Sequence, residues 1–277
     1  SSRVNESSLP DDTVKYKLLP LDEEKIRVYL DKNFGKKVDI SKINDSLVDI
    51  LRVPMYLSVF RETYDEKTSY PDIYEAKAVR KADILDSFIQ KLLDDNKGKE
   101  RSADKAVIEF VVSYFLPALA FNMYQSNLSM QLSDREFRKL RNDFDYFDSL
   151  LVPDEYLTAF HANNTEIKSV CLNFGIVAFA NGYYTFTHQN WRDLFVAKHI
   201  INCMNAEKLD ELETPVSENV RQFAGELIRE HKDGCGYSKD YMDKSDVEKA
   251  RKSECDFKDK DNLDTWHASP VEDFLQK

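Results

Sequence analysis

The stretch "YTFTHQNWRDLFVAKHI", residues 184–200, contains a change of hydrophobic period. Tyr184 and Phe186 alternate with other residues as in a β-strand, and the alternation stops at Thr187. From Trp191 onward, apolar residues recur at spacings of three, four and seven, which is the pattern of one helix face. That face consists of Trp191, Leu194, Phe195, Ile201 and Met204. The stretch therefore predicts a strand that passes directly into a helix, with His188 at the junction.

A β-hairpin is predicted immediately before this helix. Asn181-Gly182 separates two short alternating runs in "GIVAFANGYYTFTH", and this dipeptide is a strong hairpin signal. Helical patterns at residues 133–144 and 164–174 precede it. Helices followed by a two-stranded hairpin are the order of a winged helix. We therefore predict a mainly α fold, a helical domain followed by a winged-helix domain with one β-hairpin.

The composition favours a soluble, intracellular, mostly helical protein. Of 277 residues, 42% are apolar and 32% charged, and only seven are glycine and eight proline. The net charge of −11 argues against nucleic acid as a partner. The most apolar segment, residues 106–124, contains Glu109, Pro117 and Asn122, so we expect a buried core helix and no membrane partner. The four cysteines are widely spaced without CxxC, which fits a reducing cytoplasm.

The N-terminal half shows a series of amphipathic helices. Asp22 is expected to cap a helix over residues 22–34, and a second apolar face covers residues 43–51. Pro54 suits the first turn of the next helix. A long helical pattern within residues 75–100 ends at a charged segment that is the best candidate linker.

Two interpretations of His188 are open. With Thr187 as N-cap, His188 becomes the first helical residue, where unpaired N–H groups and the helix dipole favour an anion. A histidine there adds a donor that can reach a phosphate oxygen. In the alternative, His188 only caps the turn and packs beneath the hairpin.

The segment around His188 resembles the end of the winged-helix domain in NACHT-type NTPases, which belong to the STAND class of P-loop signalling ATPases. The matching positions are Phe186, His188, Asp193, Phe195 and Ala197. Most members of this class have glutamate where this chain has Asp193.

Other stretches resemble the same family in the same order. They are "LLPLDEEKIRVYL" (18–30), "LRVPMYLSVF" (51–60), "ADILDSFIQKLL" (82–93), "LPALAFNMY" (116–124) and the opening "SSR". The resemblance implies the end of a nucleotide-binding core at residues 1–14 and a helical domain at 15–100. It further implies a winged-helix domain at 101–205 and the start of a second helical domain at 206–240. We expect residues 241–277 to form a charged, partly disordered tail.

The resemblance also implies roles for three residues. In this family, ADP lies between the nucleotide-binding core and the helical domains. His188 would contact a phosphate and hold the inactive state, Pro54 would pack near the adenine, and Arg3 would sense the nucleotide from the core. The alternatives are an ordinary helix start for Pro54 and an ordinary surface arginine for Arg3.

No catalytic residues are predicted, because the chain contains no P-loop: "FGKKVD" and "NKGKE" lack the glycine spacing and the hydroxyl residue. The resemblance places the Walker motifs upstream of Ser1. It implies ADP or ATP in the parent protein, an upstream P-loop core as partner, and self-association on activation. His199 and Cys203, like His231 and Cys235, have a spacing that zinc could use only if the pairs met, and we expect coincidence and no metal.

Three functions are compared. The leading one is a nucleotide-state switch that clamps a P-loop core and releases it on activation. A DNA-binding winged helix is less favoured, because its recognition helix at 164–174 offers one lysine and its wing no basic residue. A nucleotide-independent helical adaptor would bind proteins through exposed apolar faces near residues 54–63 and 217–231.

Overall fold

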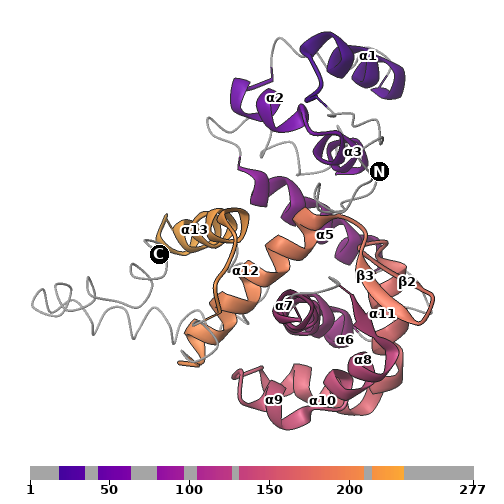
Figure 1. Cartoon of the computed structure of the whole chain (residues 1–277), viewed down its shortest axis with the longest axis vertical. Helices are drawn as coiled ribbons and strands as arrows, with labels where there is room; N and C mark the ends of the chain where they lie inside the picture. Colours follow the sequence, from indigo (N-terminus) through magenta and orange to yellow (C-terminus); the bar gives the residue numbers. More distant parts are fainter. Residues whose placement is uncertain are drawn as a thin grey trace, which may run out of the picture. The chain divides into compact units, whose positions relative to one another are not determined.

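The computed structural model describes residues 19–34, 43–63, 80–96, 105–126, 131–208 and 214–233. These residues form a mainly helical structure with a small three-stranded antiparallel sheet (Figure 1). The chain divides into two compact units between Val79 and Arg80, and each is described by itself. Arg3 and the predicted tail at residues 241–277 lie outside the described residues.

The described residues of the first unit form three short helices, α1 (Glu23–Phe34), α2 (Asp45–Leu51) and α3 (Pro54–Thr63). Asp22 caps α1 as predicted, because its carboxylate accepts the backbone N–H of Lys25 at 2.8 Å. Asn44 caps α2 in the same way through Ser46. Each helix buries an apolar face, and together these faces supply Ile26, Leu30, Leu47, Leu51, Tyr56 and Phe60.

The second unit begins with α5 (Lys81–Asn96), which the sequence analysis placed in the first domain. Phe88 of α5 packs on Trp191 with ring centroids 5.5 Å apart, and Asp86 pairs with Lys198 at 2.7 Å. The partners of α5 are thus far away in the sequence. The compact units therefore divide before α5, whereas the expected boundary follows residue 100.

A continuous apolar helix spans Lys105–Gln125 as α6 (Lys105–Phe110), a π-helical turn η3 (Val111–Phe115) and α7 (Leu116–Gln125). Within the described ranges it is the single helix long and apolar enough to cross a membrane, and 72% of its most apolar window is buried. Most of this helix is therefore packed inside the second unit. Pro117 has no N–H to offer the carbonyl of Ser113, and the side-chain amide of Asn202 donates to that carbonyl at 2.8 Å.

The sheet has the order β1-β3-β2, with β1 (Leu132–Ser133), β2 (Val177–Ala180) and β3 (Tyr183–Phe186). The predicted hairpin is confirmed: β2 pairs with β3, and Asn181 and Gly182 both have positive φ, 53° and 83°. The prediction of a hairpin alone was incomplete, because β1 adds a third strand beside β3. A two-residue strand is too short to show a period.

The helices between β1 and β2 are α8 (Asp134–Arg141), α9 (Phe144–Asp148), α10 (Asp154–Asn163), a 3-10 turn η4 (Asn164–Glu166) and α11 (Ile167–Asn173). Ser133 caps α8 as part of a capping box with Glu136, and the hydrogen bond from the Ser133 hydroxyl holds the pKa of Glu136 below its usual value. α9 and α10 were not anticipated. Aromatic residues of α9 and α10 pack with those of the apolar helix in one buried cluster. This cluster contains Phe110, Phe115, Phe137, Phe147, Phe160 and Tyr184.

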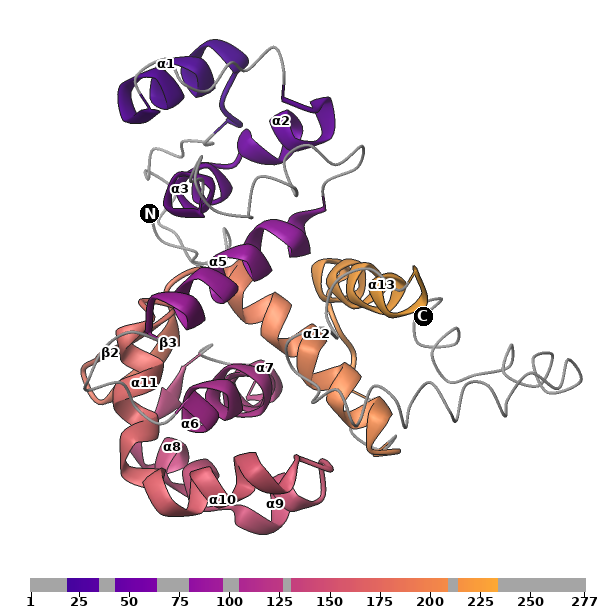
Figure 2. The same ribbon diagram turned by 180° about the vertical axis from the view of Figure 1, so that it is seen from behind.

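The last two helices among the described residues are α12 (Gln189–Asn205) and α13 (Glu218–Asp233). Figure 2 shows α12 lying between α7 and α13, in agreement with the packing of these helices. The predicted apolar face of α12 is partly wrong. Ile200 and Cys203 are buried, whereas Ile201 and Met204 are only half-buried, because α12 has helices on more than one side.

Candidate functional site

The junction between β3 and α12 is held by Thr187. Its backbone N–H donates to the carbonyl of Ile176 at 2.9 Å, and its hydroxyl lies 3.0 Å and 3.1 Å from the carbonyls of Gly175 and Ile176. The end of β3 is thereby fixed to the chain just before β2. The following residue, His188, is consequently set at the start of α12.

The N-cap of α12 is His188, so the prediction of Thr187 as the cap was wrong by one residue. His188 has extended backbone angles, φ −145° and ψ 145°, and its Nδ1 accepts the N–H of Asn190 at 3.1 Å. Thr187 cannot serve because its hydroxyl is directed at the carbonyls of Gly175 and Ile176. The imidazole does what a serine or aspartate oxygen does at most helix starts.

This hydrogen bond determines the tautomer of His188. A ring nitrogen that accepts an N–H carries no proton, so in the neutral imidazole the proton resides on Nε2. The half-buried side chain thus combines the two interpretations: Nδ1 caps the helix and Nε2–H is a donor. An anion near the positive end of α12 would meet that donor.

One turn further along α12, Arg192 and Asp193 form an ion pair at 2.8 Å, and the side chains are 7% and 0% exposed. Asn219 of α13 donates to the second oxygen of Asp193 at 3.4 Å. The Arg192 guanidinium lies over the ring of Tyr124, 5.5 Å from its centroid. Asp193, the acidic position of the family pattern, therefore faces the interior of this unit. The sequence pattern identified the residue and not this role.

A second polar group is buried further along α12. Nε2 of His199 lies 3.2 Å from the Cys203 sulfur and 3.3 Å from the Tyr146 hydroxyl, and its ring stacks on Phe121 at 4.4 Å. Within the described ranges, no cluster of three or more His, Cys, Asp or Glu residues could hold a metal ion. Cys235 and the side chain of His231 lie outside what the structure describes.

Pro54 is the first residue of α3, as predicted from the sequence, and it is exposed. It belongs to the first unit and His188 to the second, so the structure does not bring the two into one described site. Arg3 lies outside the described residues. Of the two predicted binding residues that the structure describes, Pro54 and His188, the role of His188 is argued from its polar contacts.

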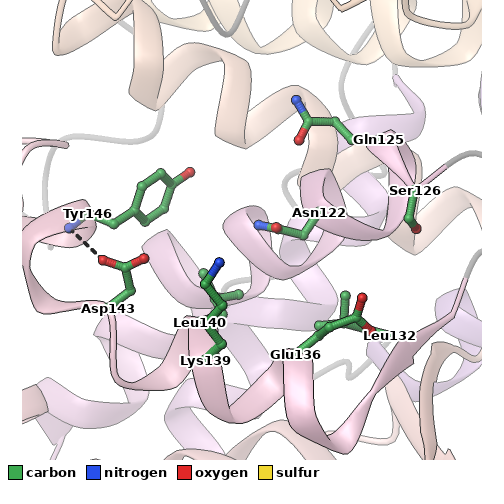
Figure 3. A pocket seen from close by; sticks show the side chains of 9 residues that line it. All are labelled: Asn122, Gln125, Ser126, Leu132, Glu136, Lys139, Leu140, Asp143 and Tyr146. Atoms are coloured by element: carbon green, nitrogen blue, oxygen red, sulfur yellow. Dashed lines mark hydrogen bonds between the residues drawn. The ribbon is translucent and has the colours of Figure 1, made fainter.

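A cavity of about 410 Å³ lies between the end of α7 and helices α8 and α9 (Figure 3). Several polar groups in its lining serve local structure: Asn122 donates to the Ala118 carbonyl, Glu136 belongs to the capping box, and Asp143 caps α9. The Tyr146 hydroxyl is directed at His199. Most of these polar side chains are thus engaged in contacts within the protein and not directed at a ligand in the cavity. The start of α12 is therefore the better candidate site.

Comparisons with models of protein families, with curated proteins and with solved structures found no match.

The structure also bears on the two alternative functions. The apolar residues of α3 and α13 that an adaptor would present are buried, among them Phe60 (1% exposed) and Phe223 (2% exposed). The lysine of the would-be recognition helix, Lys168, is directed at Asp134 at 3.5 Å and lies over the ring of Phe179. These contacts therefore lend no support to either alternative.

Proposed function

We propose that this chain is the regulatory helical and winged-helix portion of a cytoplasmic NACHT/STAND-type signalling ATPase. Its helical domains clamp an upstream P-loop core in the ADP-bound state and open on activation. In the second unit, the order α7, β1, α8, α11, β2 and β3 fits a winged helix with a two-stranded wing. The interposed α9 and α10 are insertions on that plan.

The observation that carries the proposal is the geometry of His188. The residue follows the wing directly and caps the next helix through Nδ1, which leaves the proton on Nε2. Such a ring is a neutral donor at the positive end of a 17-residue helix. A phosphate oxygen of ADP, presented by the P-loop core, is the partner that this chemistry suits.

The mechanism is a shift between two populations. A hydrogen bond to a charged phosphate contributes about 1.5–3 kcal/mol, and this applies only in the closed state that brings His188 to the nucleotide. ADP therefore favours the closed arrangement, and exchange for ATP favours the open one. Open molecules then self-associate, with ATP hydrolysis left to the upstream core.

The test compares two substitutions in the protein extended upstream to include the P-loop core. His188→Ala removes both the cap and the donor. His188→Asn keeps a side-chain oxygen that can accept the Asn190 N–H, but it cannot reach a phosphate. Bound nucleotide is released by denaturing the protein and identified as ADP or ATP by chromatography, and thermal stability is measured on the same samples.

We expect both variants to lose ADP, by about 10-fold or more in retention half-life, while His188→Asn keeps nearly normal stability. If His188→Asn retains ADP and only His188→Ala loses stability, the histidine is a helix cap.

The proposal also requires a GxxxxGK[ST] motif in the coding sequence upstream of residue 1. If that motif is absent, the proposal is wrong and the adaptor interpretation is favoured.

A further inference from the structure

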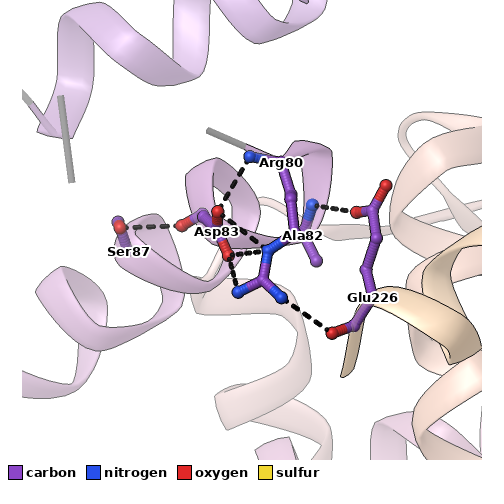
Figure 4. A network of polar contacts seen from close by, with 5 residues as sticks. All are labelled: Arg80, Ala82, Asp83, Ser87 and Glu226. Carbon is purple, nitrogen blue, oxygen red and sulfur yellow. Dashed lines mark hydrogen bonds and ion pairs between the residues drawn. The ribbon is translucent and has the colours of Figure 1, made fainter. Parts of the chain in front are cut away.

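Helix α13 is attached to the second unit at two separate places. Near its start, Asn219 donates to Asp193 of α12, and the backbone N–H of Ser217 donates to the Tyr124 hydroxyl at 2.7 Å. In its third turn, Glu226 meets the first turn of α5 (Figure 4). There its carboxylate accepts the N–H of Ala82 at 3.0 Å, and its carbonyl accepts from Arg80 at 3.0 Å.

Three charged groups in these attachments, Arg80, Asp193 and Glu226, each also have a partner on their own helix or immediately next to it. On the α5 side, the Arg80 guanidinium pairs with Asp83 at 2.9 Å. On α12, Asp193 pairs with its neighbour Arg192 at 2.8 Å. On α13, the amide of Gln222 donates to Glu226 at 2.8 Å.

Because of these local partners, the detachment of α13 would leave these charges paired. Separating a buried ion pair is strongly unfavourable because it strands a charge. Here no pair is separated, because each stays within its own segment. The start of α5 also keeps a cap of its own, since Asp83 accepts the backbone N–H of Arg80 at 2.8 Å.

The rest of the second unit has a direct link that does not involve α13. Asp86 of α5 and Lys198 of α12 form an ion pair at 2.7 Å with exposed side-chain fractions of only 8% and 16%. Phe88 of α5 also packs on Trp191 of α12, with ring centroids 5.5 Å apart. α5 and α12 therefore remain joined when α13 leaves.

We propose that α13 is a detachable strap, which opens as a unit while α5, α7 and α12 keep their packing. Its apolar face, Val220, Phe223, Ala224 and Leu227, holds it in place, and the polar contacts fix its register. Closed, it restrains the first turns of α12, where His188 lies. This regulatory role rests on the proposed function: when the strap opens, the contact of His188 with the phosphate weakens and ADP is retained for a shorter time.

The test is hydrogen–deuterium exchange on the full chain, read by mass spectrometry at peptide level. Phe223→Ala removes the largest apolar anchor of α13 and should raise exchange in residues 218–228 by about 100-fold. Exchange at Ala82 should rise with it, while the later turns of α5 and all of α7 stay protected. Phe137→Ala, in the aromatic cluster, is the matched control. In this variant, the hydrogen exchange of α13 should rise no more than that of the rest of the second unit.

If α13, α7 and α12 instead accelerate together in Phe223→Ala, the helices are one cooperative block and the strap does not exist. The link to His188 is tested separately, by ADP retention of Phe223→Ala in the upstream-extended protein. Selective opening of α13 with unchanged retention would refute that link alone. The result for His188→Asn decides the proposed function independently of both.

Discussion

Two polar residues at the start of α12, His188 and Asp193, differ in how deeply they are buried. His188, at the start of the helix, is half-buried and offers ring nitrogens with different tasks. Asp193, one turn later, is 0% exposed and is tied to Arg192 and Asn219. A buried charge of this kind is tolerated because its partner stands beside it on the same helix. Under the proposed function the first residue meets a ligand, whereas the second holds the helix in place.

The Arg192–Asp193 pair leads to a prediction about stability. Arg192→Met strands the Asp193 carboxylate and should lower the free energy of unfolding by about 3–5 kcal/mol. The double variant Arg192→Met/Asp193→Leu leaves no buried charge unpaired and should recover most of that loss, although Asn219 loses its acceptor. Urea unfolding followed by circular dichroism measures both. A double variant as unstable as the single one would mean that the pair stabilises the fold by more than avoiding an unpaired charge.

At the scale of elements, the hairpin turn between β2 and β3 does more than reverse the chain. Gly182 has φ 83° with no atoms near the position of a Cβ, so its requirement is conformational and not steric. Its carbonyl also accepts the N–H of Asp134 at 3.0 Å, which links the hairpin to the start of α8. The turn therefore connects two elements that are distant in the sequence.

We expect Gly182→Ala to destabilise the protein by about 1 kcal/mol, because an L-residue at positive φ is strained. Gly182→Asn should lose less, since asparagine tolerates the left-handed region. Thermal unfolding of the three proteins under one condition distinguishes them. Equal stability of Gly182→Ala and the parent sequence would indicate that the turn can adopt another type.

At the scale of the whole molecule, the net charge of −11 disfavours DNA binding, because DNA is itself negatively charged. The contact between Lys168 and Asp134 disfavours it further. We expect no binding of a labelled duplex in fluorescence anisotropy at 50 mM salt with up to about 10 μM protein, within the range of non-specific DNA binding. Lys168→Ala should behave identically. Saturable binding that weakens steeply with salt would contradict this and favour the DNA-binding interpretation.

What the sequence by itself determined are the features with a local physical cause. The caps at Asp22 and Ser133, the start of α3 at Pro54 and the Asn181-Gly182 turn follow from hydrogen bonding and backbone preferences within four residues. The passage from β3 to α12 follows from a change of hydrophobic period. The histidine at that junction was visible for the same reason.

Only the tertiary structure decided the features whose partners are remote in the chain. Strand β1 exists because β3 pairs with it, and α5 joins the second unit because Phe88 and Asp86 meet α12. His188 replaces Thr187 as the cap because the Thr187 hydroxyl is directed at carbonyls before β2. In each case the competing hydrogen bond or contact comes from a distant segment, and no local pattern can encode it.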